Sequence, residues 1–230
     1  MHITLSVLAL ATLLPASTRA QDPAPYPTMA SIEHYRMAFD AEVSLARSAA
    51  PASISSDAKV LVLGTAGYEV AAEGKNGFVC IVERSWANDF GKPDFWNPKL
   101  RAPICYNAAA ARSVLPSYLK RTRWALAGVS QATMEQRSEA DPTGSEIQAP
   151  EGGAMCYMLS KAGYLGDDVK GPWHPHLMFF MPRTPVAAWG ANVAGSPVFT
   201  NDAPTSPRTV FAIPVPRWSD GSQDEHVPQS

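Results

Sequence analysis

Two histidines separated by one residue carry the strongest chemical signal in the sequence. His174 and His176 flank Pro175 within residues 173–181, whose composition predicts a β-strand. Side chains alternate between the two faces of a strand, so both imidazoles share a face with Met178. Because a proline cannot donate to a neighbouring strand, this stretch is expected at an edge, where an ion or a ligand reaches the histidines.

A transition metal needs further ligands, and the preceding predicted strand offers sulfur. Cys156 and Met158 lie on one face of that strand, and Asp167 and Asp168 follow it in a loop. If the two strands pair with these faces aligned, cysteine, methionine and both histidines form one metal site. Sulfur with imidazole suits copper, whereas two histidines with a carboxylate suit zinc or non-haem iron. The alternative is that Cys156 and Met158 are core residues.

The same residues suggest a second chemistry, a thiol-dependent enzyme with Cys156 as nucleophile and His174 or His176 as base. That mechanism requires a partly exposed thiol with a lowered pKa. The apolar neighbours Met155 and Tyr157 favour a buried, unreactive thiol instead.

A pair of acids is a further candidate for hydrolysis, in this case of glycosides. Glu83 ends a predicted strand and Asp89 lies in the loop that follows, among aromatic residues of the kind that line sugar sites. The alternative is that Glu83 forms a surface ion pair with Arg84 or belongs to a turn. The loop itself is equally a candidate binding surface without catalysis; its aromatic residues are Trp86, Phe90, Phe95 and Trp96.

Three cysteines permit one disulfide and leave one thiol, and the sequence allows three pairings. We favour Cys80 with Cys105, because both belong to segments that are predicted to be extended. Cys156 is then the free cysteine.

Helical periodicity is clearest near the start of the chain, where apolar residues recur from Met29 to Ala46 and predict one amphipathic helix. Three strands follow, at 59–63, 67–73 and 78–84, and are predicted to form a meander. Residues 85–103 have no clean period and are expected to be a long ordered loop.

Helices and strands continue in blocks, which predicts an α+β domain with a mainly antiparallel sheet and several helices. Asn107 is expected to cap a short helix, Pro116 to lie in the first turn of a second, and Ser130 to cap a third. The remaining predicted elements are an extended segment at 102–106, strands at 154–160, 174–181 and 209–215, and a short helix at 184–189.

Residues 1–20 are expected to be a secretory signal peptide. Their apolar run from Ile3 to Leu14 is shorter than the roughly 20 residues of a spanning helix, and small residues precede Gln21 at the expected cleavage positions. Residues 21–218 then form a single domain, and 219–230 a polar C-terminal tail. The expected location is secreted or periplasmic.

The charge balance and the apolar stretches of the sequence limit the classes of binding partner that are expected. The 230 residues carry 19 basic and 21 acidic side chains, which gives no electrostatic reason to expect nucleic acid. No second long apolar stretch follows the first, so no integral membrane segment is expected after signal removal. A small ligand or a protein partner stays open.

Five strings together resemble a family of uncharacterised secreted bacterial proteins that has no established activity. They are residues 47–51, 76–80, 95–98, 153–158 and 173–180. The resemblance implies export and a single domain, and it implies no cofactor or catalytic residue. The residues therefore favour an exported binding protein with a two-histidine site for a metal (copper or zinc) or another ligand. A hydrolase or thiol-dependent enzyme is the alternative.

Overall fold

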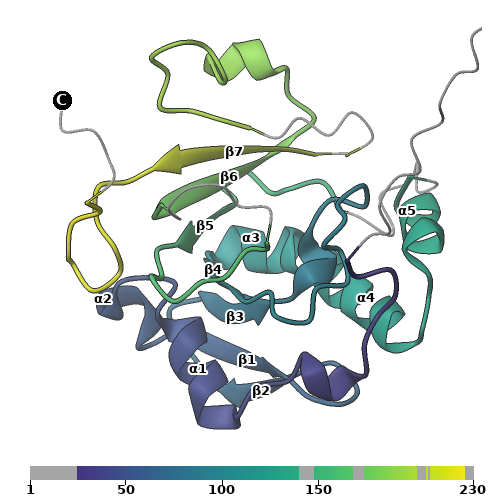
Figure 1. Ribbon diagram of the computed structural model, residues 1–230. Coiled ribbons are helices and arrows are strands. Elements are labelled where there is room, and N and C mark those ends of the chain that lie inside the picture. The colour runs from purple at the N-terminus through teal and green to yellow at the C-terminus, as the bar shows by residue number, and fades with distance from the viewer. Residues whose placement is uncertain (1–24, 140–147, 168–173, 201–205, 207, 226–230) are drawn as a thin grey trace, which may run out of the picture.

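A seven-stranded mixed sheet forms the centre of the molecule, with helices on both faces (Figure 1). The computed structural model describes residues 25–139, 148–167, 174–200, 206 and 208–225. The strands are β1 (Lys59–Leu63), β2 (Tyr68–Ala72), β3 (Val79–Glu83), β4 (Ala102–Tyr106), β5 (Met155–Met158), β6 (His176–Pro182) and β7 (Arg208–Pro214). The α-helices are α1 (Phe39–Arg47), α2 (Ala52–Ser55), α3 (Ala108–Ser113), α4 (Leu115–Leu126) and α5 (Gln131–Glu139). The predicted α+β class is confirmed.

The strand order is β2-β1-β3-β4-β5-β6-β7, and all neighbours are antiparallel except the parallel pair β1–β3. The three predicted strands before residue 85 are therefore present, but the predicted meander is wrong, because β3 pairs with β1 and not with β2. The buried strand β3 takes the inner place, while β2, which has no buried residue, forms the edge. Gly74 permits this crossing, since a Cβ there would lie 2.1 Å from the backbone nitrogen of Lys59.

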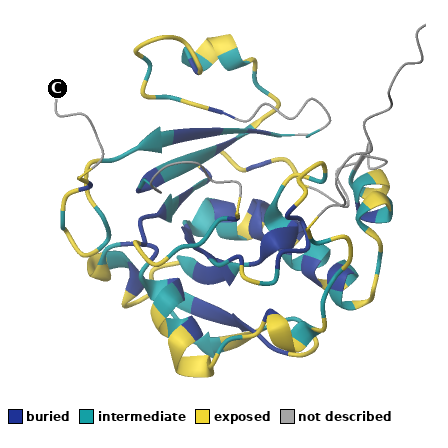
Figure 2. Ribbon diagram, viewed as in Figure 1, coloured by how far each residue is buried: buried dark blue, intermediate teal, exposed yellow. Residues whose placement is uncertain are grey.

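The sheet separates two hydrophobic clusters. One face packs α1 against Val60, Val62 and the Cys80–Cys105 disulfide. The other face packs α3 and α4 against Ile81 and Ile104, among other residues. In Figure 2 the strands β1, β3 and β4 are largely buried, whereas the 3-10 helix η3 (Val186–Trp189) beyond β7 has no buried residue.

The predicted single helix from Met29 to Ala46 is wrong in its first half. A 3-10 turn, η1 (Ile32–His34), comes first, and extended backbone at Ala38 separates it from α1. The break allows Tyr35 to enter the core, where its hydroxyl donates a hydrogen bond to the carbonyl oxygen of Trp96 at 2.8 Å. Burial of Tyr35 thus overrides the helical periodicity.

Several local predictions are confirmed. Cys80 and Cys105 form the disulfide from directly opposite positions on β3 and β4, and Cys156 is free. The loop between β3 and β4 contains only the short 3-10 helix η2 (Ser85–Ala87). Asn107 caps α3, and the hydroxyl of Ser130 accepts a hydrogen bond from the Thr133 backbone at the start of α5.

The ends of the chain differ in what the structure describes. The predicted signal peptide lies outside the described residues. Residues 219–225 of the predicted tail pack on the domain, where the backbone of Ser219 donates to Leu159 and Asp224 is buried. Among the described residues, no helix is long and apolar enough to cross a membrane.

Candidate functional site

The two strands that carry the predicted metal site pair as expected. Met158 lies opposite His176, and Cys156 lies opposite Met178, so these four side chains share one face of the sheet. His176 is buried, and its ring donates from Nδ1 to the carbonyl oxygen of His174 at 2.9 Å. Burial lowers the pKa of His176, although the hydrogen bond to the His174 carbonyl opposes this effect.

His174 precedes β6 and contacts a residue from the end of the chain. Its Nδ1 lies 2.7 Å from Oδ2 of Asp224, whose side chain is 1% exposed while that of His174 is 39% exposed. A buried carboxylate thus holds a partly exposed imidazole in one orientation. Carboxylate and carbonyl partners of this kind orient histidines in metal sites.

The other predicted metal ligands do not join the histidines. Within the described ranges, no group of three or more histidine, cysteine or acidic side chains is arranged to hold a metal ion. Asp167 instead accepts hydrogen bonds from the hydroxyls of Tyr26 and Tyr164, and Asp168 lies outside the described residues. Metal binding by His174, His176 and Cys156 therefore stays a prediction.

Cys156 occupies the core and not an accessible pocket. It is fully buried, and this burial, followed by the negative charge of Glu83, raises the pKa of its thiol well above the ordinary value. A nucleophilic thiol needs the opposite environment. Cys156 accordingly has the surroundings of an unreactive core cysteine.

Glu83 brings together the cluster of charged groups that best fits a binding site. It ends β3, and one carboxylate oxygen accepts a hydrogen bond from the hydroxyl of Tyr106 on β4. The expected surface ion pair with Arg84 is wrong, because Arg84 is fully buried and pairs with Glu42. Asp89 is exposed in the loop.

Arg208, the first residue of β7, lies on the same side of the sheet. Its guanidinium carbon is 6.0 Å from the centre of the Phe180 ring, and this ring is 6.0 Å from that of Tyr106. The Nη1 atom of Arg208 is shut off from solvent and has no hydrogen-bond partner within the described part of the chain. A buried donor without a partner costs about 1–3 kcal/mol, which an anionic ligand would relieve.

Arg121 on α4 supplies a second guanidinium. It lies over the Phe90 ring at 3.9 Å, and its Nη1 donates to the carbonyl oxygens of Ala87 and Asn88. Burial and the positive charge of Arg208 lower its pKa, Asp89 and Glu83 oppose this effect, and the resulting pKa is about 10. Both arginines stay charged at neutral pH.

Opposing effects set the protonation of Glu83. Burial raises the pKa of its carboxyl to about 7, although the Tyr106 hydrogen bond and the charges of Arg208 and Arg121 lower it. Glu83, Arg121 and Arg208 are nevertheless all partly exposed. We name these three residues and Tyr106 the Glu83 cluster.

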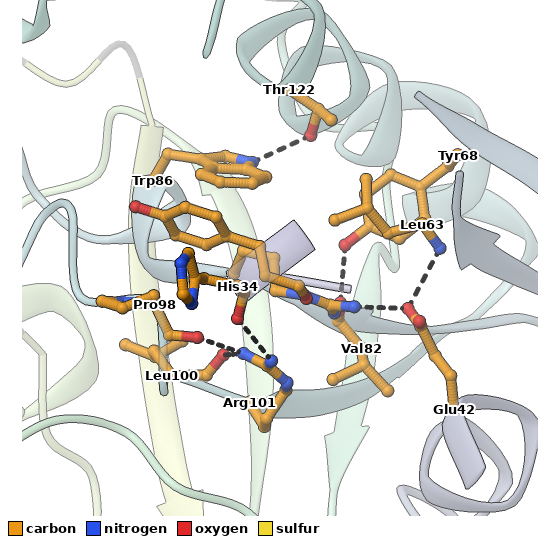
Figure 3. Close-up of polar contacts among 12 residues, drawn as sticks. His34, Glu42, Leu63, Tyr68, Val82, Trp86, Pro98, Leu100, Arg101 and Thr122 are labelled. Atoms are coloured by element: carbon orange, nitrogen blue, oxygen red, sulfur yellow. Dashed lines mark hydrogen bonds and ion pairs between the residues drawn. The ribbon is translucent and has the colours of Figure 1, made fainter. Parts of the chain in front are cut away.

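A separate network of hydrogen bonds surrounds the fully buried Arg84 and is structural. The guanidinium lies 2.7 Å from Glu42 on α1 and also donates to the carbonyl oxygens of Tyr35 and Val82. Figure 3 shows Glu42 accepting from the backbone of Leu63 as well. Nearby, Arg101 donates to the carbonyl oxygens of Pro98, Leu100 and His34 (Figure 3). All of these hydrogen bonds join groups of the protein itself, so the network connects α1, β1 and the loops and has a structural role.

The aromatic loop mostly serves the core. Trp86, Phe95 and Trp96 are at most 5% exposed, and the Trp86 indole donates to the hydroxyl of Thr122 (Figure 3). Phe90 alone of the four is partly exposed, beneath Arg121. The loop therefore contributes to the Glu83 cluster through one ring.

Reasoning from the sequence found Glu83 but missed the other members of the cluster. A charge directly after an apolar strand marked Glu83, whereas Tyr106 and Arg121 looked like ordinary strand and helix residues. Arg208 had one weak signal, a basic residue next to the apolar run 209–213.

Comparison of the chain with protein-family models, curated proteins and solved structures gave no match.

Proposed function

We propose that the protein is an exported binding protein that holds a small organic acid, by its carboxylate, between Arg208 and Glu83. The observation that carries this proposal is the buried Nη1 of Arg208, which has no hydrogen-bond partner among the described residues. Export is supported by the N-terminal apolar run and by the disulfide, since disulfides persist in oxidising compartments.

The charges of the cluster favour a monoanion. Arg121 is attracted by Asp89 as well as by Glu83, whereas Tyr106 and Glu83 are the groups of the described chain that raise the pKa of Arg208 against the effect of burial. Protonation of Glu83 therefore removes a counter-charge from Arg208. A carboxylate would accept two hydrogen bonds from the guanidinium and a third from protonated Glu83, and Phe180 offers an apolar surface beside it.

Calorimetric titration with acetate, benzoate and inorganic phosphate tests this proposal. We expect benzoate to bind more tightly than acetate, and Arg208→Gln to weaken benzoate binding by about tenfold or more, because a charge-assisted pair is lost. Arg123→Gln removes an exposed arginine of α4 and is the matched control. Equal benzoate affinity in the Arg208 variant and the wild type, or a preference for phosphate, would overturn the proposal.

A transition-metal site at His174 and His176 is a second candidate. The observation that favours it is that each Nδ1 has an orienting partner, Asp224 in one case and a backbone carbonyl in the other, which directs ligand bonds to Nε2. Elemental analysis of the untagged protein tests it. Copper or zinc should be present in the wild type, absent from the His174→Ala, His176→Ala double variant and reduced in Asp224→Asn; absence from the wild type would remove the candidate.

A further inference from the structure

A cavity of about 550 Å3 lies beside the turn from α4 into α5, and none of the four residues of the Glu83 cluster lines it. It is lined by residues 27–29, by Trp96, by Ala125 of α4 and by residues of the segment 128–135. Volumes of this size accommodate small molecules. The function proposed for the Glu83 cluster does not use this cavity.

The lining of the cavity is mainly apolar, and two of its polar side chains form hydrogen bonds within the protein. Pro27, Met29 and Val129 contribute apolar surface beside Trp96. The hydroxyl of Ser130 caps α5, and the side-chain amide of Gln131 donates to the carbonyl oxygen of Phe90. These two polar side chains therefore belong to the protein's own hydrogen bonding.

Glu135 is the charged residue of the lining. It lies one helical turn after Gln131 and Ala132 on α5, so all three face the cavity. The Glu135 side chain is partly exposed, and no described residue forms an ion pair or hydrogen bond with its carboxylate. The cavity thus combines one aromatic residue, Trp96, with a carboxylate that has no partner among the described residues.

We propose that this cavity binds a small organic cation, an ammonium group attached to an apolar body. The ammonium would pair with Glu135 and the indole of Trp96 would attract it, since cations bind to aromatic faces. The apolar body would contact Met29 and Val129. An organic acid is disfavoured here, because Glu135 repels it.

Binding of benzylamine, benzyl alcohol and benzoate tests the proposal, since the three have similar shape and differ in charge. Nuclear magnetic resonance of the purified chain reports the site through the amides of residues 28–29 and 128–135. We expect protonated benzylamine to bind about tenfold more tightly than benzyl alcohol, and Glu135→Gln to abolish that difference. Ala132→Phe, which fills the cavity, should abolish binding of both.

Two control variants separate this site from other effects. Glu69→Gln removes an exposed acid from β2 and should leave benzylamine binding unchanged, as should Arg208→Gln in the Glu83 cluster. Equal binding of benzyl alcohol and benzylamine, benzylamine affinity unchanged by Glu135→Gln, or no shift at these amides would each overturn the proposal.

Discussion

Burial raises the pKa of the Glu83 carboxyl, and Tyr106, Arg208 and Arg121 oppose this effect. The titratable and charged side chains that interact with Glu83, by charge or by a hydrogen bond, come from five elements. They are Tyr68 of β2, Tyr106 of β4, Cys156 of β5, Tyr118 and Arg121 of α4, and Arg208 of β7. The net result is a raised pKa, so the folded protein holds the proton more tightly than the unfolded chain does.

Replacing Glu83 by glutamine should therefore change how stability depends on pH. The ordinary carboxyl pKa is 4.5 and the folded value is about 7, so protonation of Glu83 favours the folded state fully below pH 4.5, and this contribution is lost as the pH rises to 7. Relative to the wild type, Glu83→Gln should become more stable by about 1–3 kcal/mol between pH 4.5 and pH 8. Urea unfolding at both values measures the difference. For Glu69→Gln, the difference in unfolding free energy from the wild type should be the same at both pH values. The prediction would be contradicted if the difference between Glu83→Gln and the wild type were also the same at both pH values.

Local signals predicted individual residues where the partner is near in sequence. Asn107 was expected to cap a helix, and its Oδ1 accepts from the backbone of Ala110 at 2.9 Å. The partners of Glu83 were not predictable in this way. Arg208 approaches it only because β7 lies in the same sheet and places its side chain on the same face.

At the scale of elements, the disulfide joins two strands that already pair. Cys80 and Cys105 are buried beneath α1, at directly opposite positions of β3 and β4 and 25 residues apart in the chain. The cross-link therefore constrains the long loop between the two strands in the unfolded chain.

Loss of this disulfide should destabilise the protein by about 2–5 kcal/mol, because the unfolded chain gains freedom. Urea unfolding of the Cys80→Ala, Cys105→Ala variant, with and without a reductant, measures the loss. The reductant should destabilise the wild type and leave the variant unchanged. A reductant effect of equal size in both proteins would show that the disulfide is not its cause.

The order of the strands in the sheet depends on which strand occupies the buried position beside β1. The strand runs at 59–63, 68–72 and 79–83 were all evident from their residues, but β3 displaced β2 from the position that a meander requires. Likewise, the helix expected from Met29 to Ala46 is broken before α1, because Tyr35 is buried and bonds to the carbonyl oxygen of Trp96.

For the whole molecule, the ion pair between Arg84 and Glu42 connects the layers. Glu42 lies on α1 and Arg84 follows β3, and neither side chain is more than 1% exposed. Removing one partner of a buried pair leaves a charge without compensation, which costs more than the pair itself contributes.

Arg84→Met should lower the free energy of unfolding by about 3–5 kcal/mol, because the Glu42 carboxylate is left in the core. Adding Glu42→Gln to Arg84→Met should recover part of that loss, and urea unfolding of the double-mutant cycle measures the coupling. The exposed pair of Arg112 and Glu151 is the control, and Arg112→Ala should cost less than about 1 kcal/mol. Equal losses for Arg84→Met and Arg112→Ala would contradict the role assigned to the buried pair.

The sequence by itself determined the α+β class, most strands, the helix caps and the favoured disulfide, because periodicity, capping and turn chemistry act between residues a few positions apart. Tertiary structure alone decided the strand order, the break before α1 and the grouping of Tyr106, Arg121 and Arg208 around Glu83. These features depend on which surfaces compete for the core and on side chains from distant segments meeting across the sheet, and no local pattern contains that information.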